Sequence, residues 1–340
     1  MSDFSDRGRS ALVTGATGFI GSVVTAHMAA GGFSVRAGTR RSPSGAVSPE
    51  NIVPTPCDLD DLAQTRGAVA DVDLVVHAAY GETAAMVAQC RTLLQAMSDA
   101  KVPALVYFSS IAVYGDRSGE ISEIMPATGS IGAYARAKME CEALVSAWAR
   151  DPAHPRRRVL ILRPGIVYGT GSHFWTDKLA ERIRAGAWGD FGRAGDGPAP
   201  LVHVDDIGAL VARAAPALLA AGGKGWPALT VLNVVGPDTP PWNDYFAALA
   251  QRIGAPALPS IGAARLRLRQ ALAVTAKIAR RLGLSASKRA MLAPTRAEIA
   301  IFSREAIYST QAAARLGLAP RIGLAEGLAR TIFPPDPAKA

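Results

Sequence analysis

Apolar positions along the chain form two alternating kinds of segment. Short runs rich in β-branched residues occur at 11–14, 33–38, 72–78, 104–109 and 159–162. Stretches with helical character lie between them, near 19–30, 59–70, 83–100 and 134–149. Strands that alternate with helices of this length indicate βαβ units and a parallel sheet, and near-continuously apolar strands indicate helices on both faces. The pattern predicts an α/β protein with a doubly wound parallel sheet.

This regular alternation stops after about residue 170, where glycine and proline become frequent. We assign residues 1–170 to a main domain and expect residues 201–235 to return to it. Segments 171–200 and 236–340 are expected to form a smaller C-terminal lobe. A chain of 340 residues is long for one compact core and suits this division.

Composition narrows the class of protein. The three cysteines, Cys57, Cys90 and Cys141, are far apart in sequence and favour reduced thiols in a cytosolic protein over a disulfide framework or a zinc site. The first ten residues lack the apolar core of a secretory signal, and no apolar run approaches the length of a membrane span. We therefore expect a cytoplasmic location.

A glycine-rich turn follows the first predicted strand and opens the first predicted helix. The segment Gly15-Ala-Thr-Gly-Phe-Ile-Gly21 has the spacing that permits a tight turn, a close backbone approach to a pyrophosphate, and close helix packing. The helix N-terminus then supplies N–H donors to the anion. The turn predicts a Rossmann-type dinucleotide site, with contacts from the residues Gly15, Thr17, Gly18, Phe19 and Ile20.

The end of the second strand bears on the choice of cofactor. An acidic residue there would bind the ribose of NAD, but this chain has Thr39-Arg40-Arg41. Arginine suits a 2′-phosphate through paired hydrogen bonds. We expect NADP in preference to NAD, with Arg40 and Arg41 as contacts. The alternative is that both arginines belong to a solvated loop.

Tyr134 and Lys138 are four residues apart and share one face of a predicted helix. A neighbouring ammonium would lower the pKa of the tyrosine from near 10 toward the range useful for acid–base catalysis. The strand 104–109 ends just before Ser110, at the edge of the sheet where such folds bind ligands. These three residues form a candidate catalytic set.

Seven motifs in order make the chain resemble the extended short-chain dehydrogenase/reductase superfamily, which includes NAD-dependent epimerases/dehydratases and enzymes similar to 3β-hydroxysteroid dehydrogenase. The resemblance runs from about residue 11 to 235 and continues weakly over 308–328. The motifs are TGATGFIG (14–21), CDLDD (57–61), VVHAA (75–79), FSSIAVYG (108–115), YARAK (134–138), LRPGIVYGTG (162–171) and VHVDD (202–206).

The resemblance implies roles for individual residues. Ser110 takes the place of the catalytic serine, Tyr134 that of the general acid/base and Lys138 that of the ribose-binding lysine. The segment after Arg163-Pro164 would pass the nicotinamide. The remaining implied cofactor contacts are Asp58 and Leu59 near the adenine, and Ala78 and Ala79 along the cofactor's path. Homodimerisation is also implied.

Departures from the family pattern favour one activity over another. Sugar-nucleotide enzymes of this kind usually carry an arginine four residues before the histidine of the HVDD motif, where this chain has Ala199. The helix after VVHAA and the arginines after the second strand also differ from many epimerases. We therefore place an NADP-dependent oxidoreductase of alcohols or ketones ahead of a nucleotide-sugar epimerase/dehydratase. A non-catalytic dinucleotide sensor is a third hypothesis.

The segment 262–297 contains nine basic residues and no acidic ones. It is interpreted as a solvated helical face, a peripheral membrane contact or a cap over an acidic substrate. Nucleic-acid binding is not expected, because few aromatic residues interleave. No metal site is expected at His77, His203, Asp205 or Asp206. Four aromatic residues are assigned either to the substrate pocket or to the core of the small lobe: Phe174, Trp175, Trp188 and Phe191.

Overall fold

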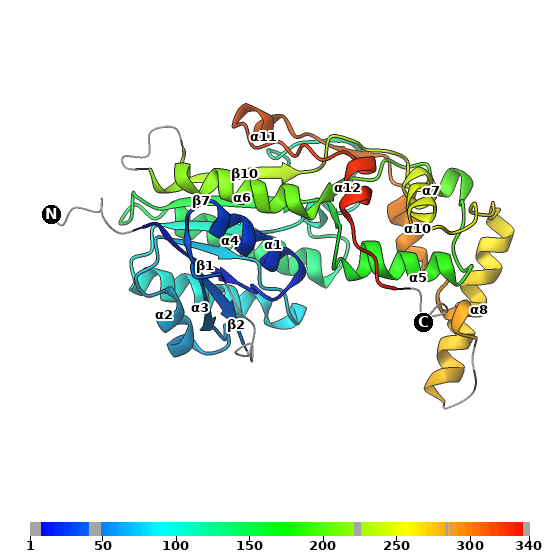
Figure 1. The fold of residues 1–340 in the computed structure, drawn as a ribbon, viewed down its shortest axis with the longest axis horizontal. Helices are drawn as coiled ribbons and strands as arrows, with labels where there is room; N and C mark the ends of the chain where they lie inside the picture. Colours follow the sequence, from blue (N-terminus) through cyan, green and yellow to red (C-terminus); the bar gives the residue numbers. More distant parts are fainter. Residues whose placement is uncertain (1–7, 41–48, 221–225, 283–284, 286, 336–340) are drawn as a thin grey trace.

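The computed structural model describes residues 8–40, 49–220, 226–282, 285 and 287–335. Within these residues, seven parallel strands form the central sheet in the order β10-β7-β5-β4-β1-β2-β3 (Figure 1). The Rossmann-type fold class expected from the sequence is confirmed. The strands are β1 (Ser10–Thr14), β2 (Ser34–Thr39), β3 (Ile52–Pro56), β4 (Leu74–His77), β5 (Ala104–Phe108), β7 (Arg158–Pro164) and β10 (Leu229–Val234).

Helices cover both faces of this sheet. Helices α1 (Phe19–Ala30) and α6 (Val204–Leu219) pack together on one face, and α2 (Leu62–Val69), α3 (Met86–Asp99) and α4 (Ala133–Ala149) cover the other (Figure 1). The strands serve both layers because successive side chains point to opposite faces. In β1, for example, Ala11 and Val13 join the core beneath α1 and α6, whereas Leu12 joins the core beneath the other helices.

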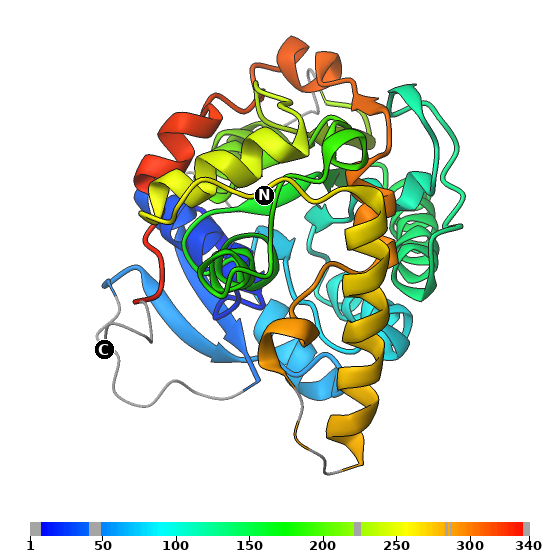
Figure 2. The same cartoon turned by 90° about the vertical axis from the view of Figure 1, so that its right-hand side faces the viewer.

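A smaller lobe stands at one end of the sheet and has its own aromatic core (Figures 1 and 2). Its helices are α5 (Lys178–Arg184), α7 (Trp242–Arg252), α8 (Ala263–Arg281), α9 (Lys288–Met291) and α10 (Arg296–Phe302). Trp188, Trp242 and Phe302 are fully buried there. The ring centre of Trp188 lies 5.3 Å from that of Phe246 and 6.0 Å from that of Phe302, and the Trp242 and Phe302 centres are 4.8 Å apart. Burial of these large rings against one another stabilises the lobe.

Two short parallel pairs join the lobe to the main sheet. Strand β6 (Gly119–Ile121) pairs with β11 (Ala306–Tyr308), and β8 (Ile166–Tyr168) pairs with β9 (Leu201–His203). Of the segment 201–235, β10 lies in the central sheet and α6 packs on it, while β9 lies in the small pair. The closing helices are α11 (Gln311–Arg315) and α12 (Leu324–Arg330).

The C-terminal segment does not divide as the sequence suggested. Residues 236–340 were assigned to the small lobe, but Ala313 and Leu318 are buried in the core of the central sheet beneath α6. The carboxylate of Asp206 fixes this segment by accepting backbone hydrogen bonds from Arg321 at 2.9 Å and Ile322 at 2.8 Å. Residues 313–322 therefore pack on the main domain, whereas Leu328 on α12 (Leu324–Arg330) lies in the core of the small lobe.

Candidate active site

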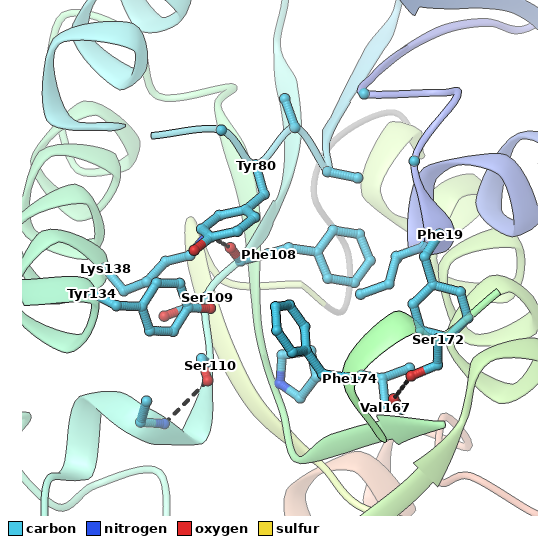
Figure 3. Close-up of a pocket in the computed structure, with 18 of the residues that line it drawn as sticks. Phe19, Tyr80, Phe108, Ser109, Ser110, Tyr134, Lys138, Val167, Ser172 and Phe174 are labelled. Atoms are coloured by element: carbon cyan, nitrogen blue, oxygen red, sulfur yellow. Dashed lines mark hydrogen bonds between the residues drawn. The ribbon is translucent and has the colours of Figure 1, made fainter. Parts of the chain in front are cut away.

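A cavity of about 1060 Å³ opens at the carboxyl ends of the central strands, between the main domain and the small lobe. Its lining combines the glycine-rich turn, the ends of β2, β4 and β5, helix α4 and parts of the small lobe. Figure 3 shows aromatic and hydroxyl side chains from these separate elements pointing into one space. The carboxyl edge of a doubly wound sheet is where such folds bind ligands.

The glycine-rich turn has no room for side chains at two positions. Gly15 has a φ of +69°, and a Cβ there would meet the backbone of Ala79 at 2.6 Å. A Cβ on Gly21 would collide with the carbonyl oxygen of Gly15. The first glycine therefore permits the turn, and the other allows α1 to pack directly against it.

The same turn presents a helix N-terminus to the cavity. Gly18 is the N-cap of α1, with extended backbone and no side-chain cap. Thr17, Gly18, Phe19 and Ile20 all line the cavity. A helix N-terminus without a capping side chain offers backbone N–H groups and positive potential to an anion. These features suit the pyrophosphate of a dinucleotide.

Most other expected cofactor contacts lie along the same cavity. Arg40, directly after β2, is exposed and lines it, whereas Arg41 lies outside the described residues. The remaining expected contacts that line the cavity are Asp58, Leu59, Ala78, Ala79 and Pro164.

The three candidate catalytic residues come together from two elements. Ser110 follows β5 and caps the 3₁₀ turn Ile111–Tyr114, where its Oγ accepts a hydrogen bond of 3.1 Å from the Ala112 backbone. Tyr134 and Lys138 lie on the cavity side of α4, and all three residues line the cavity (Figure 3). The ring of Tyr80 meets that of Tyr134 edge-on, with centres 5.6 Å apart.

The expected lowering of the Tyr134 pKa by Lys138 is not found. Burial raises the pKa of Tyr134, a hydrogen bond with Ser110 opposes this shift, and Tyr80 adds to it. The ammonium lies 6.0 Å from the centre of the Tyr134 ring and donates instead to the carbonyl oxygen of Phe108 at 2.6 Å. In this structure the Tyr134 phenol is therefore protonated at neutral pH, the form that donates a proton.

Lys138 itself is almost fully buried. Burial lowers its pKa to about 8, because the charged form loses hydration. His77, under the same cavity, has a pKa lowered to about 3 by burial and by Lys138, and its Nδ1 is 2.8 Å from the Thr14 hydroxyl. His77 is therefore neutral, and Lys138 is the cation of this part of the site.

A buried polar network behind the site was not foreseen from the sequence. Arg163 on β7 bonds to Glu142 on α4 through two hydrogen bonds, of 2.9 and 2.6 Å. Its Nη1 donates to the Tyr114 hydroxyl at 2.7 Å, and that hydroxyl donates to Asn233 on β10 at 2.7 Å. The network ties helix α4 and the turn after Ser110 to two strands of the sheet.

A large part of the cavity lining is apolar. Phe174 and Trp175 line the cavity, whereas Trp188 and Phe191 are buried in the core of the small lobe. The four aromatic residues considered from the sequence thus divide between pocket and core. Ala199 is fully buried, so that no arginine extends into the cavity from that position. Other apolar residues that line the cavity are Tyr80, Ile131, Pro198, Pro200, Ile301, Ala306 and Tyr308.

Few basic groups line the cavity in the described part of the chain. Arg40, Lys138 and Arg304 line it, and His173 does so as well. The Arg304 guanidinium donates to the Gly115 carbonyl at 2.9 Å and hydrogen-bonds to Tyr308. Part of its hydrogen-bonding capacity is therefore used within the protein. Among the described residues, no group of histidine, cysteine and carboxylate side chains could hold a metal ion.

The site fits a nicotinamide dinucleotide on two structural grounds. The turn after β1 leaves no room for a Cβ at Gly15, and α1 points an uncapped N-terminus into the cavity. In addition, the Ser109 hydroxyl is buried and has no hydrogen-bond partner in the protein, although it lines the cavity. A buried hydroxyl without a partner is costly, and a bound ligand would satisfy it.

Comparison with known proteins places the chain in a family. The model of the NAD dependent epimerase/dehydratase family matches residues 11–224, more than half of the chain. The protein belongs to this family of enzymes, which confirms the resemblance to the extended short-chain dehydrogenases/reductases. A search of curated protein sequences gave no significant match.

Solved structures share the fold along nearly the whole chain. A putative epimerase from Burkholderia cenocepacia is 22% identical, with 95% of this chain and 96% of that chain covered and a TM-score of 0.68. MoeE5, solved with UDP-glucuronic acid and NAD, is 24% identical over 95% and 97%, with a TM-score of 0.66. The human epimerase family protein SDR39U1, solved with NADPH, is 19% identical over 94% and 97%, with a TM-score of 0.64.

Proposed function

We propose that this protein is an NADP-preferring oxidoreductase that interconverts an alcohol and a ketone on a small, largely apolar molecule. The observation that supports this best is the meeting of Ser110, Tyr134 and Lys138 with the glycine-rich turn on one cavity. A sensor of dinucleotides has no use for a proton donor at this position. The nicotinamide ring, when bound, supplies the hydride acceptor or donor.

The protein residues handle the proton and the orientation of the reacting oxygen. In the reducing direction the protonated phenol of Tyr134 donates its proton to the carbonyl oxygen, while the Ser110 hydroxyl hydrogen-bonds to the same oxygen. The Lys138 ammonium provides fixed positive charge that favours the phenolate left behind. Thr17, Gly18, Phe19 and Ile20 would hold the pyrophosphate, and Arg40 would contact a 2′-phosphate.

The substrate side of the cavity supports an apolar ligand. Phe174, Trp175 and Ile301 offer ring and aliphatic surface, and burial of apolar ligand area against them is favourable. Arg304, which also lines the cavity, already hydrogen-bonds to the protein. A diphosphate would need charge-assisted hydrogen bonds in this region, each contributing roughly 1.5–3 kcal/mol.

The second candidate is a nucleotide-sugar epimerase or dehydratase with the same three residues. The family match and the neighbours solved with UDP-sugars favour it. The buried Ala199, in the position where such enzymes usually carry a diphosphate-binding arginine, argues against it.

The experiment compares cofactors and substrate classes by their binding to the full-length protein and by their turnover. Thermal unfolding is measured with NADPH, NADH, UDP-glucose and UDP-glucuronic acid, and NADPH oxidation is followed with 2-decanone, acetophenone and decalone. The proposal expects NADPH to raise the Tm most, no further rise with either sugar nucleotide, and NADPH oxidation with at least one ketone. A Tm rise with a UDP-sugar and no ketone turnover would support the second candidate.

Two further properties are part of the proposal. The implied homodimer is tested by analytical ultracentrifugation of the purified protein. The expected cytoplasmic location is tested by fractionation of the source cells. No helix in the described residues is long and apolar enough to cross a membrane.

A further inference from the structure

Helix α8 carries an apolar stripe that the rest of the described protein leaves uncovered. Leu268, Leu272 and Leu282 are 60%, 50% and 71% exposed, and Ile278 is 54% exposed. Steps of four and three residues connect positions 268, 272, 275, 279 and 282, so they lie on one face of the helix, and Ile278 lies at the border of this face. A row of large exposed aliphatic side chains at helical spacing is a marker of an interaction site.

The stripe faces away from the protein. Leu266, Ala273 and Ala276 are the buried residues of α8, and Leu266 belongs to the aromatic core of the small lobe. At 100° per residue, Leu266 and Ala273 lie about 140–160° around the helix from Leu268, and Ala276 lies about 80° from it. Figures 1 and 2 show α8 along the outer edge of the molecule, with much of its length beyond the neighbouring helices.

Cations flank the stripe on both sides. Arg267 and Arg281 project on one side, Arg265 and Arg280 project on the other, and Lys277 projects from the face opposite Leu268, by the same helical geometry. All five are exposed, and residues 263–281 contain no acidic residue. Arg269, the sixth basic residue of the helix, is half-buried and donates to the Ala187 carbonyl at 3.4 Å.

We propose that α8 docks this protein on an anionic lipid surface, with the stripe of Leu268, Leu272, Ile278 and Leu282 inserted between the headgroups. An apolar helical face bordered by basic residues is the arrangement of interfacial helices. The four flanking arginines would lie at the level of the lipid phosphates, where each cation strengthens binding roughly fivefold. This inference is independent of the proposed oxidoreductase chemistry.

The charge pattern favours a lipid surface over a second copy of the chain as the binding partner of the stripe. If two α8 helices paired through their stripes, the flanking cations of both copies would face each other with no carboxylate on either helix. Like charges in direct opposition are destabilising. A surface of negative lipid headgroups satisfies the apolar and the basic positions together.

The test is co-sedimentation of the full-length protein with vesicles. One set is phosphatidylcholine alone, and the other contains about 30% phosphatidylglycerol, each at low salt and at salt on the order of 0.5 M. The proposal expects binding to the anionic vesicles at low salt, at least about tenfold weaker binding to neutral vesicles, and a marked loss at high salt. Absence of binding to anionic vesicles at low salt would overturn it.

Two variants test the apolar stripe and the flanking cations separately. The double variant Leu272→Ser/Ile278→Ser and the triple variant Arg265→Gln/Arg267→Gln/Arg281→Gln should each weaken vesicle binding at least about tenfold. Ile124→Ser, at a position that is 94% exposed outside α8, and Arg315→Gln, on α11, are matched controls expected to bind like wild type. Unaltered thermal unfolding verifies that each variant is folded.

Ultracentrifugation of the same variants tests the alternative that the stripe binds a second copy of the chain. If Leu272→Ser/Ile278→Ser lowers the mass of the particle in the absence of lipid, the stripe is an interface between copies and the proposal is wrong. An unchanged mass together with lost vesicle binding supports the lipid surface.

Discussion

Arg163 and Glu142 form a doubly hydrogen-bonded ion pair in the protein interior, with each side chain less than a tenth exposed. The pair joins strand β7 to helix α4, which carries Tyr134 and Lys138. A buried charge that loses its partner is far more costly than the pair itself is stabilising. The ion pair therefore positions the proposed catalytic helix on the sheet.

Removal of one member of this pair should destabilise the protein strongly. Glu142→Gln leaves the Arg163 guanidinium buried without a counter-charge, and we expect a loss of about 3–5 kcal/mol in the free energy of unfolding, measured by urea denaturation. Glu140→Gln, at an exposed position of the same helix, is the control and should change stability by less than about 0.5 kcal/mol. A small loss for Glu142→Gln would mean that the pair has little structural role.

The glycine-rich turn can be tested without unfolding it. At Gly18 the backbone is extended and an added Cβ would contact only the Gly15 carbonyl, at 3.2 Å. Gly18→Ala should therefore change stability by less than about 1 kcal/mol but weaken NADPH binding at least about tenfold, because the methyl group blocks the pyrophosphate. Calorimetric titration measures the affinity. Gly67→Ala on α2, where a Cβ meets nothing within 4 Å, should bind NADPH normally.

We expect Arg40 to determine the preference for NADP over NAD. Loss of a charge-assisted hydrogen bond costs about 1.5–3 kcal/mol, so Arg40→Ala should weaken NADPH binding roughly tenfold to hundredfold. Binding of NADH, which has no 2′-phosphate, should stay near its wild-type value. Arg66→Ala, distant from the cavity on α2, is the control. Equal affinities of wild type for NADPH and NADH would contradict the proposed preference for NADP.

The buried Lys138 predicts an unusual pH dependence of stability. Its pKa is about 8 in the folded protein and near 10.5 when exposed, so the folded state binds fewer protons between these values. Stability therefore rises with pH across this window. Relative to Lys138→Met, wild type should gain on the order of 3 kcal/mol between about pH 8 and 10.5 in urea denaturation. Lys101→Met, at an exposed position, should follow wild type throughout.

Much of the fold could be predicted from the sequence because its strands are buried on both faces. Such strands appear as continuous apolar runs, as in Leu74–His77 and Ala104–Phe108. Strand β3 (Ile52–Pro56) was missed for a physical reason: it lies at the sheet edge, contains Pro54 and Pro56, and is largely exposed. Its pattern therefore has neither alternation nor an apolar run.

The candidate site was predictable where its residues follow local rules. Gly15 and Gly18 follow a strand, and Tyr134 and Lys138 share a helical face. The ion pair between Glu142 and Arg163 has no such signal, since its partners lie on a helix and a strand and meet only through tertiary packing. The Tyr134 pKa was misjudged because burial and the direction of the Lys138 ammonium depend on that packing as well.

The central claim is that Tyr134 donates the proton in a nicotinamide-dependent reduction. The most direct measurement is NADPH oxidation by Tyr134→Phe with the ketone that wild type reduces fastest, together with its NADPH affinity. Tyr168→Phe, at a buried tyrosine that does not line the cavity, is the matched control. We expect Tyr134→Phe to lose about 10²–10⁴-fold in turnover with NADPH affinity nearly unchanged. Turnover within about tenfold of wild type would contradict the account.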